Sequence, residues 1–470
     1  MQKTNICLIN DSFPPAIDGV SNAVLNYAEI ISGLSAKATV VTPYYPDADD
    51  SGYPFEVIRY PSVDTTRLVG YRAGIPFNPA IMNRLENSEF DLIHSHCPIT
   101  STMLARALRD RIDVPVVLTY HTKFDIDIAN AIRSKTLQEG ATRLLAENIS
   151  ACDEVWTVSN GAGENLRKIG YEGKYSVMPN GVDFPRGRLD EDRVAELTSG
   201  PDLPGGVPVF LFVGRMMWYK GIRIILDAMG MLKASGKDFR MVFIGSGADR
   251  EEIMAYSAGL GLDGKVLFQE AVHDREQIRA WYCRADLFLF PSTFDTNGLV
   301  VREAAACALA SILVKGSCAA EDVTDGISGF LIEENAQSLA ARIMDLLTAP
   351  ETMRVVGEGA QHDIYISWEE SVKHAYERYG IILDDYRAGR YPKHNRMTDE
   401  FFHAVAKSLD AVIQTEKTAQ KMRVIMTEER KKAMASATAG VNELGANIAG
   451  NVKKANDFAA DLYHITDRFK

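Results

Sequence analysis

The chain has 470 residues, 46% of them hydrophobic and 24% charged, and its formal net charge is −12 at pH 7. This length exceeds what one hydrophobic core usually holds, which predicts two or three domains. The negative charge argues against a nucleic-acid partner, because phosphate contacts need a basic face. No apolar run reaches the roughly 20 residues of a membrane-spanning helix. The chain opens almost directly on a strand pattern, so we expect a cytoplasmic protein without a signal peptide.

Residues 1–186 are predicted to form an α/β domain. Helical patterns alternate there with apolar runs typical of strands, namely NICLIN, KATVVTP, FDLIHSH, VPVVLTYH, EVWTVS and YSVMPNG. This alternation is typical of a parallel sheet covered by helices. Gly19 stands at the expected start of the first helix, where a residue without a side chain lets a phosphate approach the backbone. A plain turn explains the same glycine equally well.

Three histidines follow the expected strands of this domain. His94 and His96 lie at the end of one strand, and His121 lies at the end of another. Histidines at alternate positions raise the question of a metal site. No carboxylate or cysteine stands at a spacing that would complete the ligand set, so we predict no metal.

Residues 187–206, a charged stretch with glycine and proline, are predicted to link this domain to a second α/β domain at 207–368. The second domain repeats the alternation through PVFLFVG, FRMVFIG, KVLFQEA, LFLFPS, ASILVKG and GFLIEE. Doubly wound domains bind ligands at the carboxyl ends of their strands, so two such domains predict a site in a cleft between these ends. A closing helix is expected at 369–390 and a helical appendage at 391–470.

Two cations follow the first strand of the second domain. The segment VGRMMWYKG places Arg215 and Lys220 five positions apart around a turn. Such cations can stabilise a leaving diphosphate, whose negative charge rises as its bond breaks. Taken alone, the pair also fits an ordinary charged surface. Further along, FIGSGADR has Gly245 and Gly247 but Arg250 where a dinucleotide fingerprint needs a third glycine, which argues against a nicotinamide cofactor.

The stretch STFDTNGLVVREAA places Asp295 and Glu303 on either side of the pair Asn297 and Gly298. An apolar strand precedes the pair and helix formers follow it. The first amides of the expected helix offer an anion site, and each carboxylate can accept two hydrogen bonds from a vicinal diol. A nucleotide-sugar has this layout of sugar diol, diphosphate and ribose diol. The alternative is a solvated Asp in a loop and a Glu on an exposed helix face.

In this order and spacing, the motifs resemble those of the retaining glycosyltransferases of the GT-B fold, specifically family 4 with its E-x7-E motif. The resemblance covers about residues 4–390 and implies two doubly wound parallel-sheet domains that face a cleft, here with a C-terminal helical extension. The matching segments are the loop around Gly19, YHT at His121, VSNG at Ser159, MPNGVDF at Asn180, GRMMWYKG, IGSG, ADLFLFPS, STFDTNGLVVREAA and EDVTDGISGFL.

The resemblance also implies a role for each candidate residue. Arg215 and Lys220 would bind the donor diphosphate, Glu303 would hold the ribose diol, and Asp295 and His121 would contact hydroxyls of the donor sugar. The implied donor-binding set is Gly19, Arg215, Lys220, Gly245, Asp295, Asn297, Gly298, Leu299 and Glu303. The implied catalytic set is His121, Arg215, Lys220 and Asp295. The resemblance implies no cofactor, since the nucleotide-sugar is a substrate, and no metal or protein nucleophile.

The chain departs from the family pattern at the donor loops. Asp295 stands where the family usually has Glu, and Asn297 stands where it commonly has Phe. The glycine pair of the first loop is reduced to Asp18-Gly19. Because an aspartate reaches less far than a glutamate, we expect the donor sugar to sit differently or to be a different sugar. The Glu303 end follows the family pattern.

We therefore expect a retaining transferase that uses a nucleoside-diphosphate sugar, with UDP-glucose as the first choice. The segments RYPSVDTTRLVGYRAGIPFNP and TYHTKFD resemble the branch that glycosylates diacylglycerol at a membrane surface. They supply the expected acceptor residues Tyr71, Arg72 and Phe124. A membrane lipid is the favoured acceptor, and another carbohydrate is the alternative. Two different functions stay open: a nucleotide-sugar epimerase, and a non-catalytic subunit that binds nucleotide weakly.

The expected appendage has its own pattern. Apolar or small residues recur every three or four positions from Val441 to Phe469, and an earlier stripe runs from Phe401 to Val412. This heptad-like spacing predicts helices that pack on the protein itself or on a second copy, as in a homo-oligomer. Peripheral contact with the inner face of a membrane is the alternative, and disorder is a third outcome.

Overall fold

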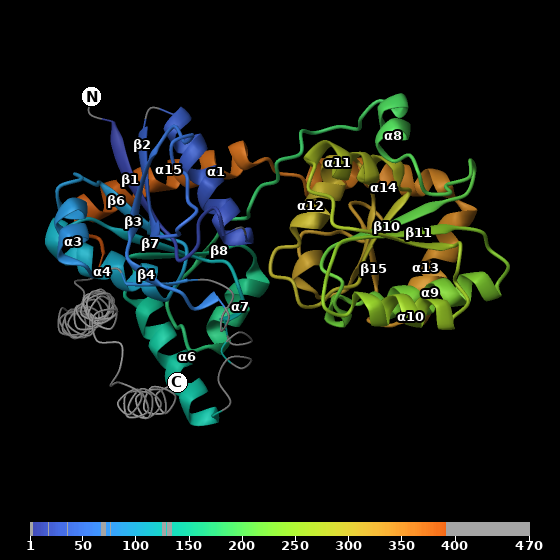
Figure 1. Ribbon diagram of the computed structural model, residues 1–470, viewed down its shortest axis with the longest axis horizontal. Helices are drawn as coiled ribbons and strands as arrows, with labels where there is room; N and C mark the ends of the chain where they lie inside the picture. The colour runs from blue at the N-terminus through green and yellow to red at the C-terminus, as the bar shows by residue number, and fades with distance from the viewer. Residues whose placement is uncertain are drawn as a thin grey trace, which may run out of the picture. The chain divides into compact units, whose positions relative to one another are not determined.

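The computed structural model describes residues 3–16, 18–34, 36–66, 72–75, 77–124, 128 and 134–391. These residues belong to one compact unit, Met1–His403, in which Figure 1 shows two α/β domains. The appendage expected at 391–470, except Tyr391, and the acceptor candidate Tyr71 lie outside the described residues.

The first domain is built on a parallel sheet of seven strands in the order β3-β2-β1-β6-β7-β8-β9. The strands are β1 (Thr4–Ile9), β2 (Ala36–Pro43), β3 (Glu56–Tyr60), β6 (Leu92–Ser95), β7 (Val116–Tyr120), β8 (Glu154–Thr157) and β9 (Ser176–Val177). A separate antiparallel pair joins β4 (Ser62–Val63) to β5 (Ala73–Gly74). The order of the large sheet reverses between β1 and β6, and doubly wound sheets bind ligands at such a point.

The helices that the structure describes between these strands are α1 (Gly19–Gly33), α3 (Pro79–Glu86), α4 (Thr100–Ile112), α6 (Lys135–Ser150) and α7 (Asn160–Lys168). The first of them begins at Gly19 because the carboxylate of Asp18 accepts hydrogen bonds from the amides of Val20 and Ser21. The Ser21 hydroxyl in turn accepts from the Asp18 amide, which completes a capping box. The Asp18-Gly19 pair is thus a well-formed helix start.

The second domain is built on six parallel strands in the order β12-β11-β10-β13-β14-β15. The strands are β10 (Val209–Val213), β11 (Arg240–Ile244), β12 (Val266–Gln269), β13 (Leu287–Phe290), β14 (Ser311–Val314) and β15 (Phe330–Ile332). Its helices are η1 (Trp218–Lys220), α9 (Ile222–Ala234), α10 (Arg250–Gly259), α11 (Arg275–Arg284), α12 (Leu299–Ala306), η2 (Cys318–Ala320), α13 (Ala336–Thr348) and α14 (Pro350–Asp363). The order reverses between β10 and β13, so the expected pair of doubly wound domains is confirmed.

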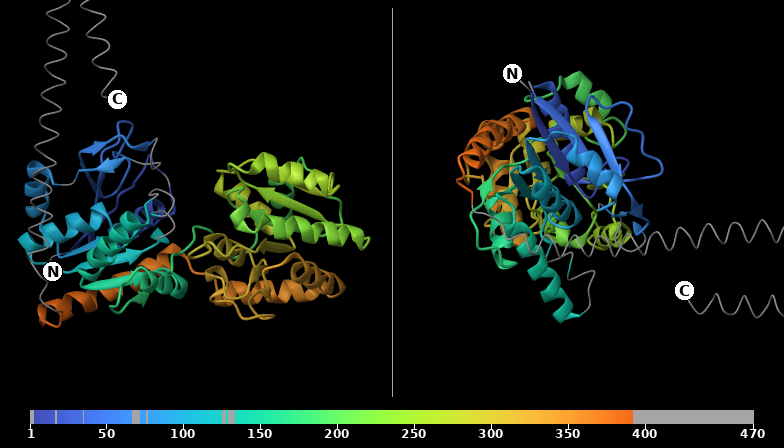
Figure 2. Two further views of the ribbon diagram at one scale, coloured as in Figure 1. Left: turned by 90° about the horizontal axis from the view of Figure 1, so that it is seen from below. Right: turned by 90° about the vertical axis from the view of Figure 1, so that its left-hand side faces the viewer.

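Two segments join the domains. The stretch expected to be a linker contains α8 (Glu191–Leu197), which packs against α11 of the second domain. The last described helix, α15 (Trp368–Arg387), follows the second domain in the chain but packs against α1 of the first. Figure 2 shows this orange helix lying along the first domain. Its residues Trp368, Val372 and Tyr379 belong to the core of the first domain. The exact domain boundaries stay predictions.

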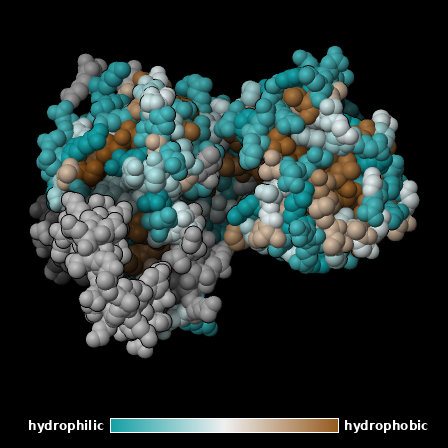
Figure 3. All heavy atoms as spheres, viewed as in Figure 1, coloured by the Kyte–Doolittle hydropathy of each residue, from teal (hydrophilic) through white to brown (hydrophobic). Residues whose placement is uncertain are grey.

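No helix among the described residues is long and apolar enough to cross a membrane. The face of the molecule in Figure 3 mixes hydrophilic residues with scattered hydrophobic ones. The exposed large hydrophobic side chains include Tyr44, Val63, Ile99 and Leu144 of the first domain and Ile327 and Val355 of the second. Such single exposed side chains are common on protein surfaces and need no special explanation.

Candidate functional site

Five of the predicted site residues follow strands that lie at or beside the reversal points of the two sheets. In the second domain, Arg215 and Lys220 follow β10, and Asp295 follows β13. In the first domain, Gly19 follows β1 and His121 follows β7. This placement is the one expected for a ligand that binds at the carboxyl ends of parallel strands.

Lys220 and Asp295 form an ion pair. The side chain of Lys220 is 8% exposed, and its Nζ lies 2.5 Å from Asp295 Oδ1. The Ser292 hydroxyl donates to the other carboxylate oxygen of Asp295 at 2.6 Å. Both oxygens of Asp295 are therefore hydrogen-bonded within the protein. The sequence assigned these two residues to different parts of a ligand, whereas the structure joins their side chains, and their ligand roles stay predictions.

Arg215 lies near the same ion pair. Its guanidinium carbon is 5.9 Å from the centroid of the Tyr219 ring, and Lys220 Nζ is 5.6 Å from that centroid. Arg215 itself is exposed, while Lys220 is buried. The two cations predicted to meet a diphosphate thus flank one aromatic ring, and the exposed one is open to a ligand.

The backbone around Gly245 leaves no room for a side chain. Its φ is +147°, and a Cβ at this position would lie 2.0 Å from the carbonyl oxygen of Gly214. A Cβ at Gly247 would lie 2.3 Å from the carbonyl oxygen of Met216. The two glycines therefore allow the loop after β11 to lie against the loop after β10. A contact between Gly245 and a donor stays a prediction.

Glu303 on α12 is held by two side chains of α11. Arg275 Nη2 lies 2.7 Å from Glu303 Oε1, and the Tyr282 hydroxyl donates to Oε2 at 2.9 Å. Arg275 Nε also lies 3.3 Å from a carboxylate oxygen of Asp183. The Glu303 side chain is 12% exposed. Each carboxylate oxygen has further acceptor capacity, so Glu303 is oriented by the protein and can still accept bonds from a diol.

The turn before α12 has the features of an anion site. Gly298 precedes the helix with a φ of +60°, and no side chain that the structure describes caps the first amides, which begin at Leu299. Asn297 Oδ1 accepts a hydrogen bond from Arg302 Nε at 3.3 Å, while its buried Nδ2 has no partner among the described residues. Helix amides and an amide N–H donor are groups that bind phosphate or hydroxyl oxygens.

His121 is buried at the end of β7, with 6% of its surface exposed. Its Nε2 lies 3.1 Å from Nδ1 of His96, the first residue after β6. Burial lowers the pKa of His121 to about 4, with a smaller opposing effect of the Asp18 charge. The ring is therefore neutral at pH 7 and acts as a hydrogen-bonding group without charge.

Hydrogen bonds connect the first domain to the loop that carries Asp295. The Thr296 hydroxyl donates to the backbone carbonyl of His121 at 2.9 Å, and the Ser159 hydroxyl donates to the carbonyl of Thr296 at 2.5 Å. Nearby, the Glu321 carboxylate accepts from the amide of Gly161 at 2.9 Å at the start of α7. His121 and the Asp295 loop thus belong to one site built from both domains.

The described acceptor candidates, Arg72 and Phe124, make contacts within the first domain that do not by themselves indicate a ligand site. Arg72 Nε donates to the Ser62 hydroxyl at 2.9 Å and to the Tyr44 carbonyl at 3.1 Å, so Arg72 braces the small β4–β5 sheet. The Phe124 ring packs on Tyr120, with centroids 5.7 Å apart. A Cβ at Gly19 would meet no atom of the described residues within 4 Å, so their packing does not require a glycine there.

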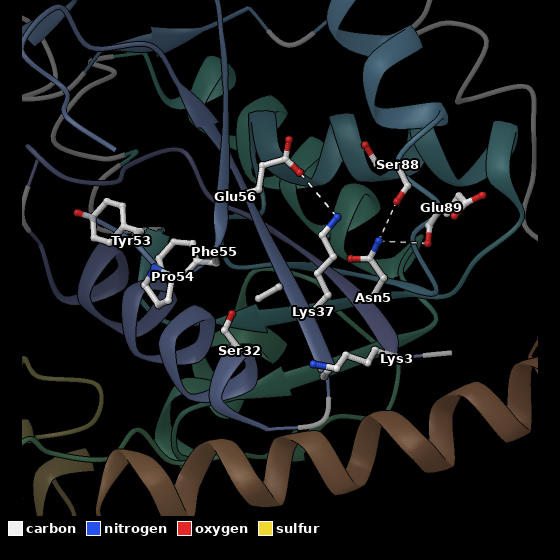
Figure 4. A pocket seen from close by; sticks show the side chains of 12 residues that line it. Lys3, Asn5, Ser32, Lys37, Tyr53, Pro54, Phe55, Glu56, Ser88 and Glu89 are labelled. Carbon is white, nitrogen blue, oxygen red and sulfur yellow. Dashed lines mark hydrogen bonds and ion pairs between the residues drawn. The ribbon is translucent and has the colours of Figure 1, made fainter. Parts of the chain in front are cut away.

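Two hollows lined by described residues contain none of the predicted residues. One, of about 690 Å³, lies at the amino ends of β1 and β2, where Lys3, Asn5, Lys37 and Glu56 line it (Figure 4). The other, of about 610 Å³, lies along α9 and the start of α13. Among the described residues no three His, Cys, Asp or Glu side chains gather as metal ligands would.

Several contact residues were not predicted from the sequence. Arg275 and Tyr282 lie 28 and 21 positions before Glu303, and no local signal relates them to it. Ser292 and Thr296 lie within the motif around Asp295. Their hydroxyl groups, close to that carboxylate in sequence, were a signal that could have identified them as contacts. His96 was weighed only as a metal ligand, and its contact with His121 depends on the sheet order.

The fold and this site define a glycosyltransferase of the GT-B type. The family model described as Glycosyltransferase Family 4 matches residues 17–186, and the model described as Glycosyl transferases group 1 matches residues 196–363. D-inositol 3-phosphate glycosyltransferase 2 of Catenulispora acidiphila is 30% identical over 321 residues, which are 65% of this chain and 74% of that protein. The chain therefore belongs to the GT-B glycosyltransferase family that these two models and this relative represent.

More distant relatives match over a larger share of the chain. Alpha-monoglucosyldiacylglycerol synthase of Acholeplasma laidlawii is 23% identical over 386 residues, which are 79% of this chain and 94% of that protein. Sucrose-phosphate synthase of Thermosynechococcus elongatus has a similar structure, with a TM-score of 0.66, 21% identity, and coverage of 81% of this chain and 100% of the other. HepE of Anabaena, solved with UDP-glucose, has a TM-score of 0.60 at 18% identity, with coverage of 80% and 99%. The structural matches show the fold alone.

Proposed function

We propose that the protein transfers a sugar, with retention, from a nucleoside-diphosphate sugar to a lipid hydroxyl such as that of diacylglycerol. The observation that carries the proposal is the arrangement of Glu303, the uncapped start of α12 and the Lys220–Asp295 pair around the same turn. Ribose diol, diphosphate and sugar hydroxyls find matching groups there in that order. UDP-glucose is the favoured donor, in line with the ligand of the Anabaena structure.

The ion pair sets the order of events on donor binding. A diphosphate that reaches Lys220 replaces Asp295 as the partner of its ammonium group. The freed Asp295 carboxylate then accepts hydrogen bonds from the donor sugar. As the glycosidic bond breaks, charge grows on the departing phosphate, and Arg215 and Lys220 stabilise it. The departing phosphate takes the proton of the acceptor hydroxyl, so the step needs no metal.

The acceptor is proposed from two kinds of relative. The synthase of Acholeplasma laidlawii, whose name gives a diacylglycerol lipid, matches over 94% of its length. The 30% identical relatives are named for D-inositol 3-phosphate, which supports a soluble polyol phosphate as the second candidate. With a lipid acceptor, the protein works at the cytoplasmic face of a membrane as a peripheral enzyme.

A turnover screen tests the proposal. The full chain is incubated with UDP-glucose, UDP-galactose or GDP-mannose, each with diacylglycerol vesicles, with inositol 3-phosphate, or with no acceptor. We expect a glycolipid from UDP-glucose and diacylglycerol, unchanged by EDTA. Glu303→Gln should abolish most of the glycolipid formation. Glu251→Gln, which changes an exposed glutamate on α10, should leave it intact. Product only with inositol 3-phosphate supports the second candidate. Sugar interconversion without acceptor indicates an epimerase, and donor binding without product indicates a non-catalytic subunit.

A further inference from the structure

Two buried nitrogen atoms at the first-domain side of the site have no hydrogen-bond partner among the described residues. They are Nε2 of His96 and Nδ1 of His121. The other nitrogen of each ring points to its neighbour, since His96 Nδ1 lies 3.1 Å from His121 Nε2. The rings are inclined by only 24°, which suits an in-plane N–H···N hydrogen bond. The two histidines therefore form a pair that has one open nitrogen at each end.

A third histidine does not compete for this pair. The ring of His94 packs against that of His96, with centroids 4.0 Å apart and ring planes inclined by 37°. Its Nδ1 lies 2.5 Å from the Tyr379 hydroxyl and its Nε2 lies 2.7 Å from the Thr119 hydroxyl. Both nitrogens of His94 are thus occupied. His94 therefore does not exchange a hydrogen bond with His96 or His121, and only these two rings share the protons of the pair.

The pair holds two ring protons, one on each residue. Burial lowers the pKa of His96 well below its usual value, with smaller contributions from His94 and His121, and burial also lowers the pKa of His121 to about 4. Both rings are therefore neutral, with one N–H each. One proton lies between the rings in the shared hydrogen bond. The other lies on an open nitrogen, either His121 Nδ1 or His96 Nε2.

A nearby carboxylate favours one of these two arrangements. Both open nitrogens are buried, and a buried N–H without an acceptor is rarer in proteins than a buried acceptor without a donor. The negative charge of Asp18 acts on His121, whereas only His94 and His121 act on His96, so the open proton is better placed on His121. In that arrangement His96 Nδ1–H donates to His121 Nε2, and His121 Nδ1 carries the proton that needs an acceptor.

The backbone of His121 is tied to the donor loop. Its carbonyl accepts the hydroxyl of Thr296, the residue that follows Asp295. The ring is thus fixed on one side by His96, and its backbone is fixed by the loop that carries the carboxylate assigned to the donor sugar. An open N–H at this place matches a hydroxyl oxygen of that sugar.

We propose that His96 is a positioning residue, which holds His121 in the Nδ1–H tautomer and so presents a neutral hydrogen-bond donor to an oxygen of the donor sugar. The part that concerns the sugar rests on the proposed function. The part that concerns the tautomer rests on the two rings and does not need activity. One measurement can therefore test the tautomer, and a separate one can test its use.

Nitrogen-15 NMR of the full chain, labelled at its nine histidines, tests the tautomer without ligand. The signals of His121 are identified by their loss in His121→Asn. We expect a protonated-type shift for Nδ1 and a bare-type shift for Nε2, the reverse of the form that free neutral histidine prefers. His96→Leu should move His121 toward the Nε2–H form. A proton found on His121 Nε2 in the wild-type protein would overturn the inference. This measurement does not depend on any substitution of His96.

Rates of sugar transfer test the use of the tautomer. His96→Leu should lower kcat/KM by about tenfold to a hundredfold through misplacement of His121. His96→Asn places an amide N–H near the former Nδ1, so it should restore most of the rate and the Nδ1–H signature. A slow His96→Asn variant with the signature intact would contradict the positioning role. If the signature is as expected but His121→Asn transfers sugar at the full rate, the tautomer stands and the proposed role of His121 in donor binding is wrong.

Discussion

The two halves of the site satisfy their polar groups in opposite ways. In the second domain, Lys220 and Asp295 neutralise each other, and Glu303 is held by an arginine and a tyrosine. In the first domain, His96 and His121 are neutral, and each has one nitrogen that no described residue contacts by a hydrogen bond. A ligand must therefore displace Asp295 to reach Lys220 in the second domain, whereas it only adds a partner to the two histidines of the first. Removing one member of a buried ion pair leaves the other unpaired, so the largest losses are expected in the second domain.

Replacement of Lys220 by alanine should have the largest effect. The variant lacks a cation where charge grows on the departing phosphate, so kcat should fall by about a hundredfold or more. The donor dissociation constant should change less than kcat, because the interaction strengthens toward the transition state. Steady-state rates and calorimetry with the donor measure the two quantities. The exposed lysine variant Lys237→Ala is the control, and a Lys220→Ala protein with normal kcat and weak donor binding would contradict the leaving-group role.

Replacement of Glu303 by glutamine should weaken donor binding by about 1.5 to 3 kcal/mol, as for the loss of hydrogen bonds to a charged group. The fold should persist, because Arg275 keeps its contact with Asp183. Tyr282→Phe removes one of the bonds that orient Glu303, so it should give a smaller loss of the same kind. Calorimetric titration with UDP and with the donor measures both. Equal donor affinity in Glu303→Gln and the unchanged protein would remove Glu303 from the ribose site.

The neutral histidines predict a loss of stability in acid. Burial lowers the pKa of His121 to about 4 and holds the pKa of His94 and His96 well below the usual value. Between about pH 6.5 and pH 4, the unfolded chain binds protons that the folded chain does not, so stability falls as pH falls. Each such group contributes about 1.4 kcal/mol per pH unit in this window. Denaturant midpoints against pH should show a shallower slope for His121→Asn, and an unchanged slope would contradict the neutral state of His121.

The smallest effect is expected where the halves meet. Thr296→Val keeps the shape of the side chain but removes its hydrogen bond to the His121 carbonyl, which should cost about 1 kcal/mol of stability. Sugar transfer should slow by only a few-fold, about the effect of a small shift in His121. Thr293→Val changes an exposed hydroxyl of the same loop and serves as the control. If both variants melt at the same temperature and transfer sugar at the same rate, the Thr296 contact does not join the two halves.

The order of strands and helices was largely predictable from the sequence, because buried parallel strands are near-continuous apolar runs. The apolar segment LFLFPS, predicted to be a strand, contains β13, and the segment NICLIN, also predicted to be a strand, contains most of β1. The sequence analysis missed β3 (Glu56–Tyr60), whose residues EVIRY mix charged and apolar side chains at the edge of the sheet. The placement of α15 was also missed, because an amphipathic pattern does not specify which core the helix joins.

The position of the site was predictable, but the bonds within it were not. Motifs after strands predicted that Lys220, Asp295 and His121 follow the carboxyl ends of sheet strands, and the structure has them there, after β10, β13 and β7. The internal partners depend on contacts between distant parts of the chain, such as Lys220 with Asp295, 75 positions apart, and His96 with His121, 25 apart. Such pairings follow from the packing of loops, which no local spacing encodes. The ligand roles of these residues stay predictions.

The return of α15 to the first domain affects the order in which the protein can be completed during synthesis. Tyr379 stacks on Trp156 and bonds to His94, and Trp368 and Val372 fill the same core. The ribosome makes the whole second domain before it makes these residues. The first domain therefore emerges from the exit tunnel early but closes its core late, and a chain cut after residue 186 would leave the surface beneath α15 open to water and to chaperones.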